Sequence, residues 1–147
     1  MQDTSPQTTS TRKLERILAA LAAAVCLLLC AFIWRVVSAQ QPMWPLPALY
    51  LLEMLAASFL GMWDIWSSET RRHSAIVTWV VTGILFAFVI IGAWSVGFLF
   101  IPVAGLLAGA AVLSDRRQGR SLALHLGVGL AAALAQAALM LVVIGLL

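Results

Sequence analysis

Two ionisable side chains within long apolar stretches are the first candidates for chemistry in this sequence. Glu53 stands in the stretch Leu-Leu-Glu-Met-Leu, and Arg35 follows Trp34 near the end of an earlier apolar stretch. A charged group in apolar surroundings is costly unless it is paired, hydrogen-bonded or neutralised. Arg35 and Glu53 therefore form the leading candidate site, either as a charge pair or as a site for an ion or cation.

Three interpretations of this candidate site are open. If the two stretches are neighbouring antiparallel helices, Arg35 and Glu53 lie at similar depth, where an ion pair can fix the helix hairpin. In the second interpretation, Glu53 exchanges a proton or binds a cation. In the third, Arg35 extends toward water and Glu53 faces water or a partner subunit.

The remaining ionisable residues lie near basic segments and do not form a recognisable site. Asp64 precedes Arg71 and Arg72 and is expected to lie beside these cations, while His125 is expected at an interface just beyond a basic segment. His73 and His125 have no Cys, Asp or Glu at the spacing of a metal site. The sequence also lacks the G-x-S-x-G, H-E-x-x-H, Walker and Rossmann patterns. We therefore expect no catalytic residues, no metal and no cofactor.

Small residues recur at a spacing of four, which places them on one face of a helix. Gly105 and Gly109 form a GxxxG pattern, and the last apolar stretch carries two stripes, Gly127-Ala131-Ala135 and Gly129-Ala133-Ala137. Such stripes let helices in a membrane approach closely, and Gln136 can form a hydrogen bond to another helix. This last stretch is the predicted surface for central packing or for contact with another subunit.

The composition identifies the elements that must position these residues. Of 147 residues, 63% are hydrophobic and 10% are charged, whereas soluble domains carry about 25% charged residues. The apolar stretches are continuous rather than alternating, which favours helices over strands. In lipid, helices satisfy every backbone hydrogen bond internally. The sequence predicts an all-α transmembrane helical bundle surrounded by the lipid bilayer.

The apolar stretches divide into about five spans. Residues 1–13 are polar and rich in Ser and Thr, which predicts a disordered cytoplasmic tail before a single transmembrane domain at 14–147. The uninterrupted apolar region after residue 74 is about two spans long, and its glycines near 92–97 indicate the break. Pro102 is expected to kink the fourth helix. The predicted spans are 14–38, 47–66, 75–92, 95–113 and 121–147.

The basic residues predict the orientation of the bundle. They form clusters at Arg12 to Arg16, at Arg71 and Arg72, and at Arg116 to Arg120, all of which fall on one side if the spans alternate. Basic clusters between apolar spans are typical of cytoplasmic loops rather than of nucleic-acid binding. We expect a plasma (bacterial inner) membrane protein with a cytoplasmic N-terminus and an outside C-terminus. Alternatively, residues 1–39 are a signal peptide cleaved after Val37-Ser38-Ala39, which leaves four helices.

These features favour a non-enzymatic accessory, assembly or scaffold subunit of a membrane complex. Its expected partners are lipid, other membrane subunits or further copies of itself, and not nucleic acid. The alternative is a small transporter or ion-coupled carrier that uses Glu53. A lipid-modifying enzyme is the least favoured class, because such an enzyme needs paired acid and base groups or a metal near one interface.

Overall fold

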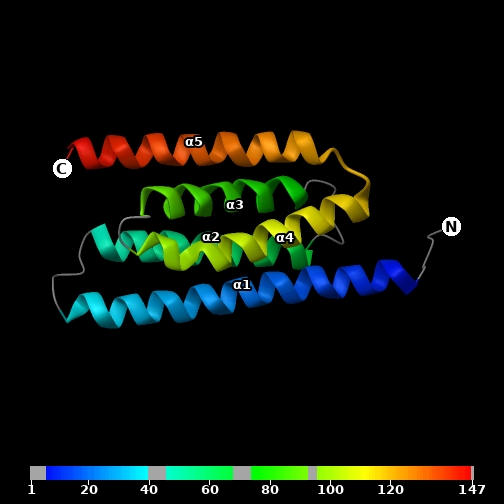
Figure 1. Ribbon diagram of the computed structural model, residues 1–147, viewed down its shortest axis with the longest axis horizontal. Coiled ribbons are helices and arrows are strands. Elements are labelled where there is room, and N and C mark those ends of the chain that lie inside the picture. Colours follow the sequence, from blue (N-terminus) through cyan, green and yellow to red (C-terminus); the bar gives the residue numbers. More distant parts are fainter. Residues whose placement is uncertain (1–5, 40–45, 68–73, 93–95, 147) are drawn as a thin grey trace.

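The protein is all-helical in the residues that its computed structural model describes, which are 6–39, 46–67, 74–92 and 96–146. Five α-helices and one 3-10 helix follow each other along these described residues, and Figure 1 labels the α-helices. They are α1 (Pro6–Ser38), α2 (Leu46–Ser67), α3 (Ser74–Ile91), η1 (Gly97–Phe100), α4 (Ile101–Gln118) and α5 (Leu122–Leu146). The predicted all-α helical bundle is confirmed.

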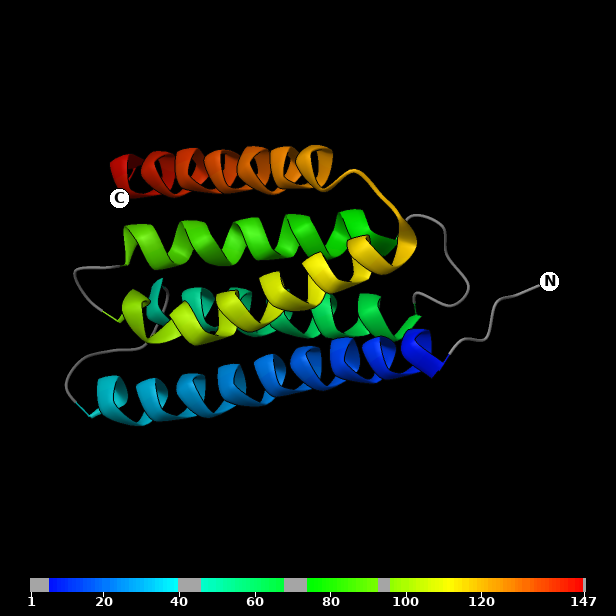
Figure 2. The ribbon, with the colours of Figure 1, turned by 45° about the vertical axis from the view of Figure 1, so that its right-hand side comes forward.

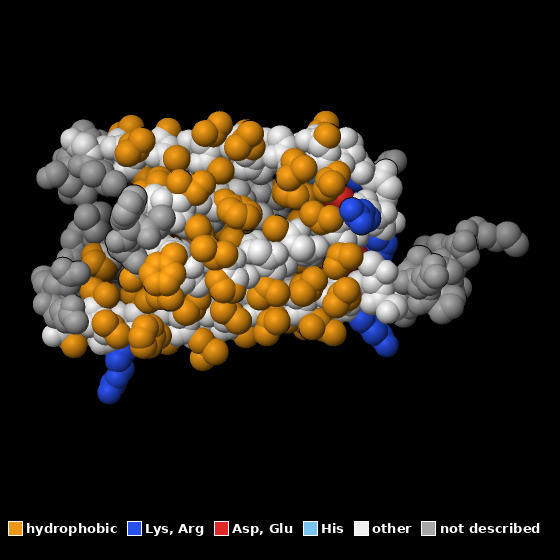
Figure 3. Space-filling view, in the orientation of Figure 1, with side chains coloured by type: hydrophobic (Ala, Val, Ile, Leu, Met, Phe, Trp, Pro, Cys, Tyr) orange, Lys and Arg blue, Asp and Glu red, His pale blue; other side chains and the backbone are white. Residues whose placement is uncertain are grey.

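The helices lie side by side and alternate in direction between two ends of the bundle (Figures 1 and 2). The beginnings of α1, α3 and α5 and the last turns of α2 and α4 share one end. We call it the basic end, because it holds six of the seven described Lys and Arg residues, Arg12, Lys13, Arg16, Arg116, Arg117 and Arg120, whereas Arg35 lies in the last turn of α1 at the opposite end. The opposite end is called the far end. Figure 3 shows hydrophobic side chains covering the visible face between these ends, with Lys and Arg side chains at the ends.

Four helical segments of the described chain are long and apolar enough to cross a membrane. They are Ser10–Ser38, Pro47–Ser67, Gly97–Gln118 and Leu122–Val143. The apolar part of α3, Ile76–Ile91, is shorter. However, α3 runs between the same two ends as its neighbours (Figure 2). About five spans are therefore consistent with the bundle.

Two boundaries differ from the predicted ones. Residues 6–13 were expected to belong to a disordered tail, but α1 begins at Pro6 and includes them; residues 1–5 lie outside the described part. The fourth span begins with the 3-10 turn Gly97–Phe100, and Pro102 lies in the first turn of α4. A proline in a first turn removes no helical hydrogen bond, so a junction between two helix types replaces the expected kink.

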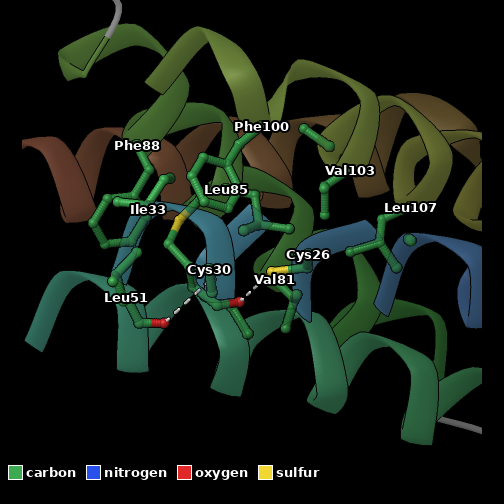
Figure 4. Packing of buried hydrophobic residues seen from close by; sticks show 14 residues of the cluster. Cys26, Cys30, Ile33, Leu51, Val81, Leu85, Phe88, Phe100, Val103 and Leu107 are labelled. Atoms are coloured by element: carbon green, nitrogen blue, oxygen red, sulfur yellow. Dashed lines mark hydrogen bonds between the residues drawn. The ribbon is translucent and has the colours of Figure 1, made fainter. Parts of the chain in front are cut away.

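The core lies where α1, α2, α3 and α4 meet, and two thiols contribute to it. Cys26 Sγ donates to the Met54 carbonyl at 3.5 Å, and Cys30 Sγ donates to the Leu51 carbonyl at 3.8 Å. Both cysteines are free and buried, and Figure 4 shows them beneath Leu85, Phe88 and Phe100. Because a cysteine side chain is small and weakly polar, it lets α1 lie close to the α2 backbone.

The last helix, α5, is attached mainly to α3. Their backbones approach closely at Gly83 of α3 and Gly129 of α5, where a Cβ added to Gly83 would overlap the Gly129 carbonyl oxygen. A Cβ on Gly129 would in turn lie 3.2 Å from the Trp79 carbonyl oxygen. Only glycine at position 83 allows this approach, since any side chain there meets backbone atoms.

Candidate functional site

The leading site lies between α2 and α5, where Glu53 meets Gln136. The Gln136 amide Nε2 donates to Glu53 Oε1 at 2.7 Å, although the two residues are 83 positions apart. Gln136 is 8% exposed, whereas Glu53 is exposed at the surface of the described chain. Both side chains line a groove of about 780 Å³ whose other lining side chains are apolar apart from the hydroxyl of Tyr50. The structure thus places a carboxylate, held by one amide, in an apolar groove.

Arg35 does not join this site. Its side chain is exposed, and in the described residues Glu53 forms its hydrogen bond with Gln136 and no ion pair with Arg35. The groove is lined by Ile33 and Val37 of α1. These residues differ from Arg35 by two positions, which correspond to about 200° around a helix, so the Arg35 side chain points away from the groove. The predicted hairpin-fixing pair is replaced by the contact between Glu53 and Gln136.

A second polar cluster, at the basic end, is centred on Asp115 of α4. Asp115 is fully buried, and its Oδ2 accepts hydrogen bonds from Trp79 Nε1 and from His125 Nδ1, each at 2.8 Å. The turn that follows Asp115 makes the His125 contact possible. Gly119 adopts φ +61°, its amide bonds back to Arg116, and α5 begins three residues later at Leu122. Glycine is suited to this left-handed cap.

Two further polar contacts lie at the same end. Arg117 holds the buried Glu15 in a two-pronged ion pair, with Nε at 2.9 Å and a second nitrogen at 3.0 Å. Thr78 donates to Oδ2 of Asp64 at 2.6 Å. The predicted neighbours of Asp64, Arg71 and Arg72, lie outside the described residues. Together with Asp115, these contacts link all five helices near the basic end.

Sequence reasoning did not single out Asp115, Glu15 or Trp79. Asp115 and Arg117 belong to a basic segment that reads as a solvated loop, but the structure continues α4 through Gln118. Glu15 and Arg117 are separated by 102 positions, so no local spacing reveals the pair. One signal was present: Asp115 and His125 flank a glycine that can end a helix, which is the layout of a short helical hairpin.

The small residues separate into packed and uncovered groups. Gly129 and Gly83 lie in the contact between α5 and α3. A Cβ atom added to Gly109 would lie 3.9 Å from the side chain of Leu18 in α1. Added Cβ atoms on Gly105 and Gly127 would meet nothing within 4 Å. The side chains of Ala131 and Ala135 are also exposed. The stripe Gly127-Ala131-Ala135 therefore faces away from the described bundle.

The described residues hold no group of three or more His, Cys, Asp or Glu side chains arranged for a metal ion. His125 and Asp64 lie near the same end but bond to different partners, Asp115 and Thr78. The two polar regions thus differ in character. The basic-end contacts tie helices together, although the second oxygen of Asp115, Oδ1, is buried without a hydrogen-bond partner, whereas Glu53 stands in an open groove.

Comparison with protein-family models, with curated proteins and with solved structures finds no match to this chain. The described residues are all-helical, and four of their helices are long and apolar enough to cross a membrane. Any function must therefore be inferred from the grooves, faces and polar contacts of the bundle itself.

Proposed function

We propose that this protein is a non-enzymatic accessory, assembly or scaffold subunit of a membrane complex. The observation that supports this proposal best is the uncovered small-residue stripe of α5. Gly127, Ala131 and Ala135 face outward, while the opposite side of α5 packs on α3 through Gly129. Because α5 packs on its own bundle through one face of small residues, its second face of small residues is available for contact with another helix.

The physical reason for expecting a partner on this stripe concerns helix association in lipid. Hydrocarbon chains solvate leucine as well as another helix does, so burial of large apolar side chains gives little driving force there. Small residues instead allow backbones to approach and gain close packing. The stripe is therefore better suited to a transmembrane helix, from another subunit or a second copy, than to lipid alone.

For the setting, we propose a plasma (bacterial inner) membrane with the N-terminus cytoplasmic and the C-terminus outside. The support is that the described Lys and Arg residues other than Arg35 lie at one end of the bundle. Lys and Arg are enriched in cytoplasmic loops of membrane proteins. With the basic end on the cytoplasmic side, α5 runs outward and Glu53 lies nearer the outer surface.

Purification of the tagged full chain in mild detergent tests the accessory role. We expect the chain to elute with a defined membrane partner, or as an oligomer, and Gly127→Leu to release that association. The Gly127→Leu chain should still fold, because an added Cβ there meets open space. Ala24→Leu, on an exposed position of α1, is the matched control and should leave the association intact. A wild-type chain that is stable as a lone monomer with no co-purifying partner would contradict the proposal.

A second candidate function is a small transporter or ion-coupled carrier that uses Glu53. The groove between α2 and α5 favours this candidate, because it holds a carboxylate among apolar walls. Proton-linked uptake into vesicles containing the purified protein tests it, with Glu53→Gln as the variant. Equal uptake by wild type and variant would remove the candidate.

A further inference from the structure

The groove that contains Glu53 has the size and the walls of a site for a small organic molecule. Its volume is about 780 Å³, within the range of about 300–1,000 Å³ that is common for ligand pockets. Residues of α2 and α5 form its sides, and residues of α1 and α3 also line it. The apolar lining includes Ile33, Val37, Tyr50, Phe88, Leu139 and Met140. These walls suit an apolar molecular body.

The charge in the groove is uncompensated by the described part of the chain. Glu53 is the one ionisable carboxylate among the lining residues, and they include no Lys, Arg or His. Among the described residues, the hydrogen-bond partner of its carboxylate is the amide of Gln136, a neutral donor to Oε1. A carboxylate in hydrocarbon is costly unless a proton or a positive charge accompanies it. The groove is therefore complementary to a cation.

The chemistry of the lining distinguishes between kinds of cation. A metal ion such as Mg²⁺ or Ca²⁺ needs six or more oxygen ligands, including water, and the side chains that line the groove offer one carboxylate, one amide and the hydroxyl of Tyr50. An organic ammonium needs one counter-charge and apolar contact for its substituents. Tyr50 and Phe88 add two aromatic rings, packed edge to face with centroids 4.7 Å apart, and such rings attract cations.

We propose that the groove between α2 and α5 binds an amphipathic organic monocation. Its positive nitrogen lies at the Glu53 carboxylate, which Gln136 holds in place, and its apolar substituents lie along Phe88, Leu139 and Met140. The inference does not depend on the accessory role. It names the class of ligand that the carrier candidate would transport. Because it concerns binding alone, a binding measurement tests it independently of any transport measurement.

Equilibrium binding to the purified full-length protein in nanodiscs tests the inference. The probes are radiolabelled benzyltributylammonium and its neutral isostere, in which carbon replaces the nitrogen. We expect saturable binding of the ammonium with one site per chain. Glu53→Gln should weaken it by about tenfold or more, equivalent to about 1.4 kcal/mol or more, while Glu53→Asp keeps the charge and retains most of the affinity. The isostere should bind wild type and Glu53→Gln equally.

Asp64→Asn is the matched control for loss of a carboxylate. It lies outside the groove, and the amide oxygen can still accept the hydrogen bond from Thr78, so binding should be unchanged. Three outcomes would overturn the inference: no saturable ammonium binding by the wild type, equal affinity of wild type and Glu53→Gln, or equal affinity of the wild type for the ammonium and its isostere. The last outcome would indicate an apolar groove suited to lipid chains.

Discussion

Nδ1 of His125 lies 2.8 Å from Oδ2 of Asp115, so a fully buried carboxylate joins the end of α4 to the first turn of α5. The same oxygen also accepts the indole N–H of Trp79 in α3. Three helices thus meet at one atom. Because a buried donor that loses its acceptor is costly, this carboxylate should contribute strongly to stability.

Asp115→Leu is expected to destabilise the protein by about 2–4 kcal/mol, because two buried donors lose their acceptor. Asp115→Asn should have a smaller effect, since the amide oxygen can still accept. Thermal unfolding in detergent, followed by circular dichroism, measures both. Arg116→Gln, at an exposed neighbouring position, is the control. Equal stability of wild type and Asp115→Leu would show that the contacts to Trp79 and His125 carry little free energy.

The ion pair between Glu15 and Arg117 should behave as a coupled unit. Arg117→Leu leaves the buried Glu15 without its two-pronged partner, which is expected to cost about 3 kcal/mol. The double variant Glu15→Leu with Arg117→Leu should recover much of that loss, because no unpaired charge remains. A double-mutant cycle on unfolding free energies tests this coupling. Additive effects of the two substitutions would argue against a coupled pair.

The contact between α3 and α5 predicts opposite responses of two glycines. Gly83→Ala should destabilise the protein by about 1–3 kcal/mol, because the new methyl group overlaps the Gly129 carbonyl oxygen. Gly127→Ala should instead stabilise the protein by up to about 1 kcal/mol, because its methyl group enters open space and alanine favours a helix more than glycine does. Unfolding of both variants in the same detergent compares them directly. Similar losses for the two would place α5 in a different register.

The orientation can be tested with single introduced cysteines. Ala39→Cys places an exposed thiol at the far end and Arg116→Cys places one at the basic end. A membrane-impermeant maleimide applied to intact cells should label Ala39→Cys only, and both should react after lysis. The native Cys26 and Cys30 are buried, so the maleimide should not label them. Labelling of Arg116→Cys in intact cells would show that the basic end faces outward, which is opposite to the proposed orientation.

The fold could be predicted from composition because lipid imposes a simple rule. A long continuous apolar stretch, such as the one that forms α5, must pair all of its backbone N–H and C=O groups within itself when lipid surrounds it. A helix is the structure that does so. Boundaries were harder, since they depend on local detail. Residues 6–13 have a tail-like composition, but the helix continues through them toward the buried Glu15.

The candidate site could be predicted only in part. The cost of a carboxylate in an apolar stretch singled out Glu53, and the same reasoning marked Gln136 as a residue that bonds across helices. That these two residues are each other's partners depends on the rotation and register of α2 and α5. Those quantities are set by distant backbone contacts, such as the one at Gly83, which no spacing in the sequence encodes.

The close approach of Gly83 and Gly129 has a geometric consequence for the groove. The two helices, α3 and α5, share the most extensive contact in the described bundle, and His125 of α5 also bonds to Asp115 of α4 at the basic end. On the side of the groove, the bond from Gln136 to Glu53 joins α5 to α2. The carboxylate that gives the groove its charge therefore also ties together the two helices that form its sides.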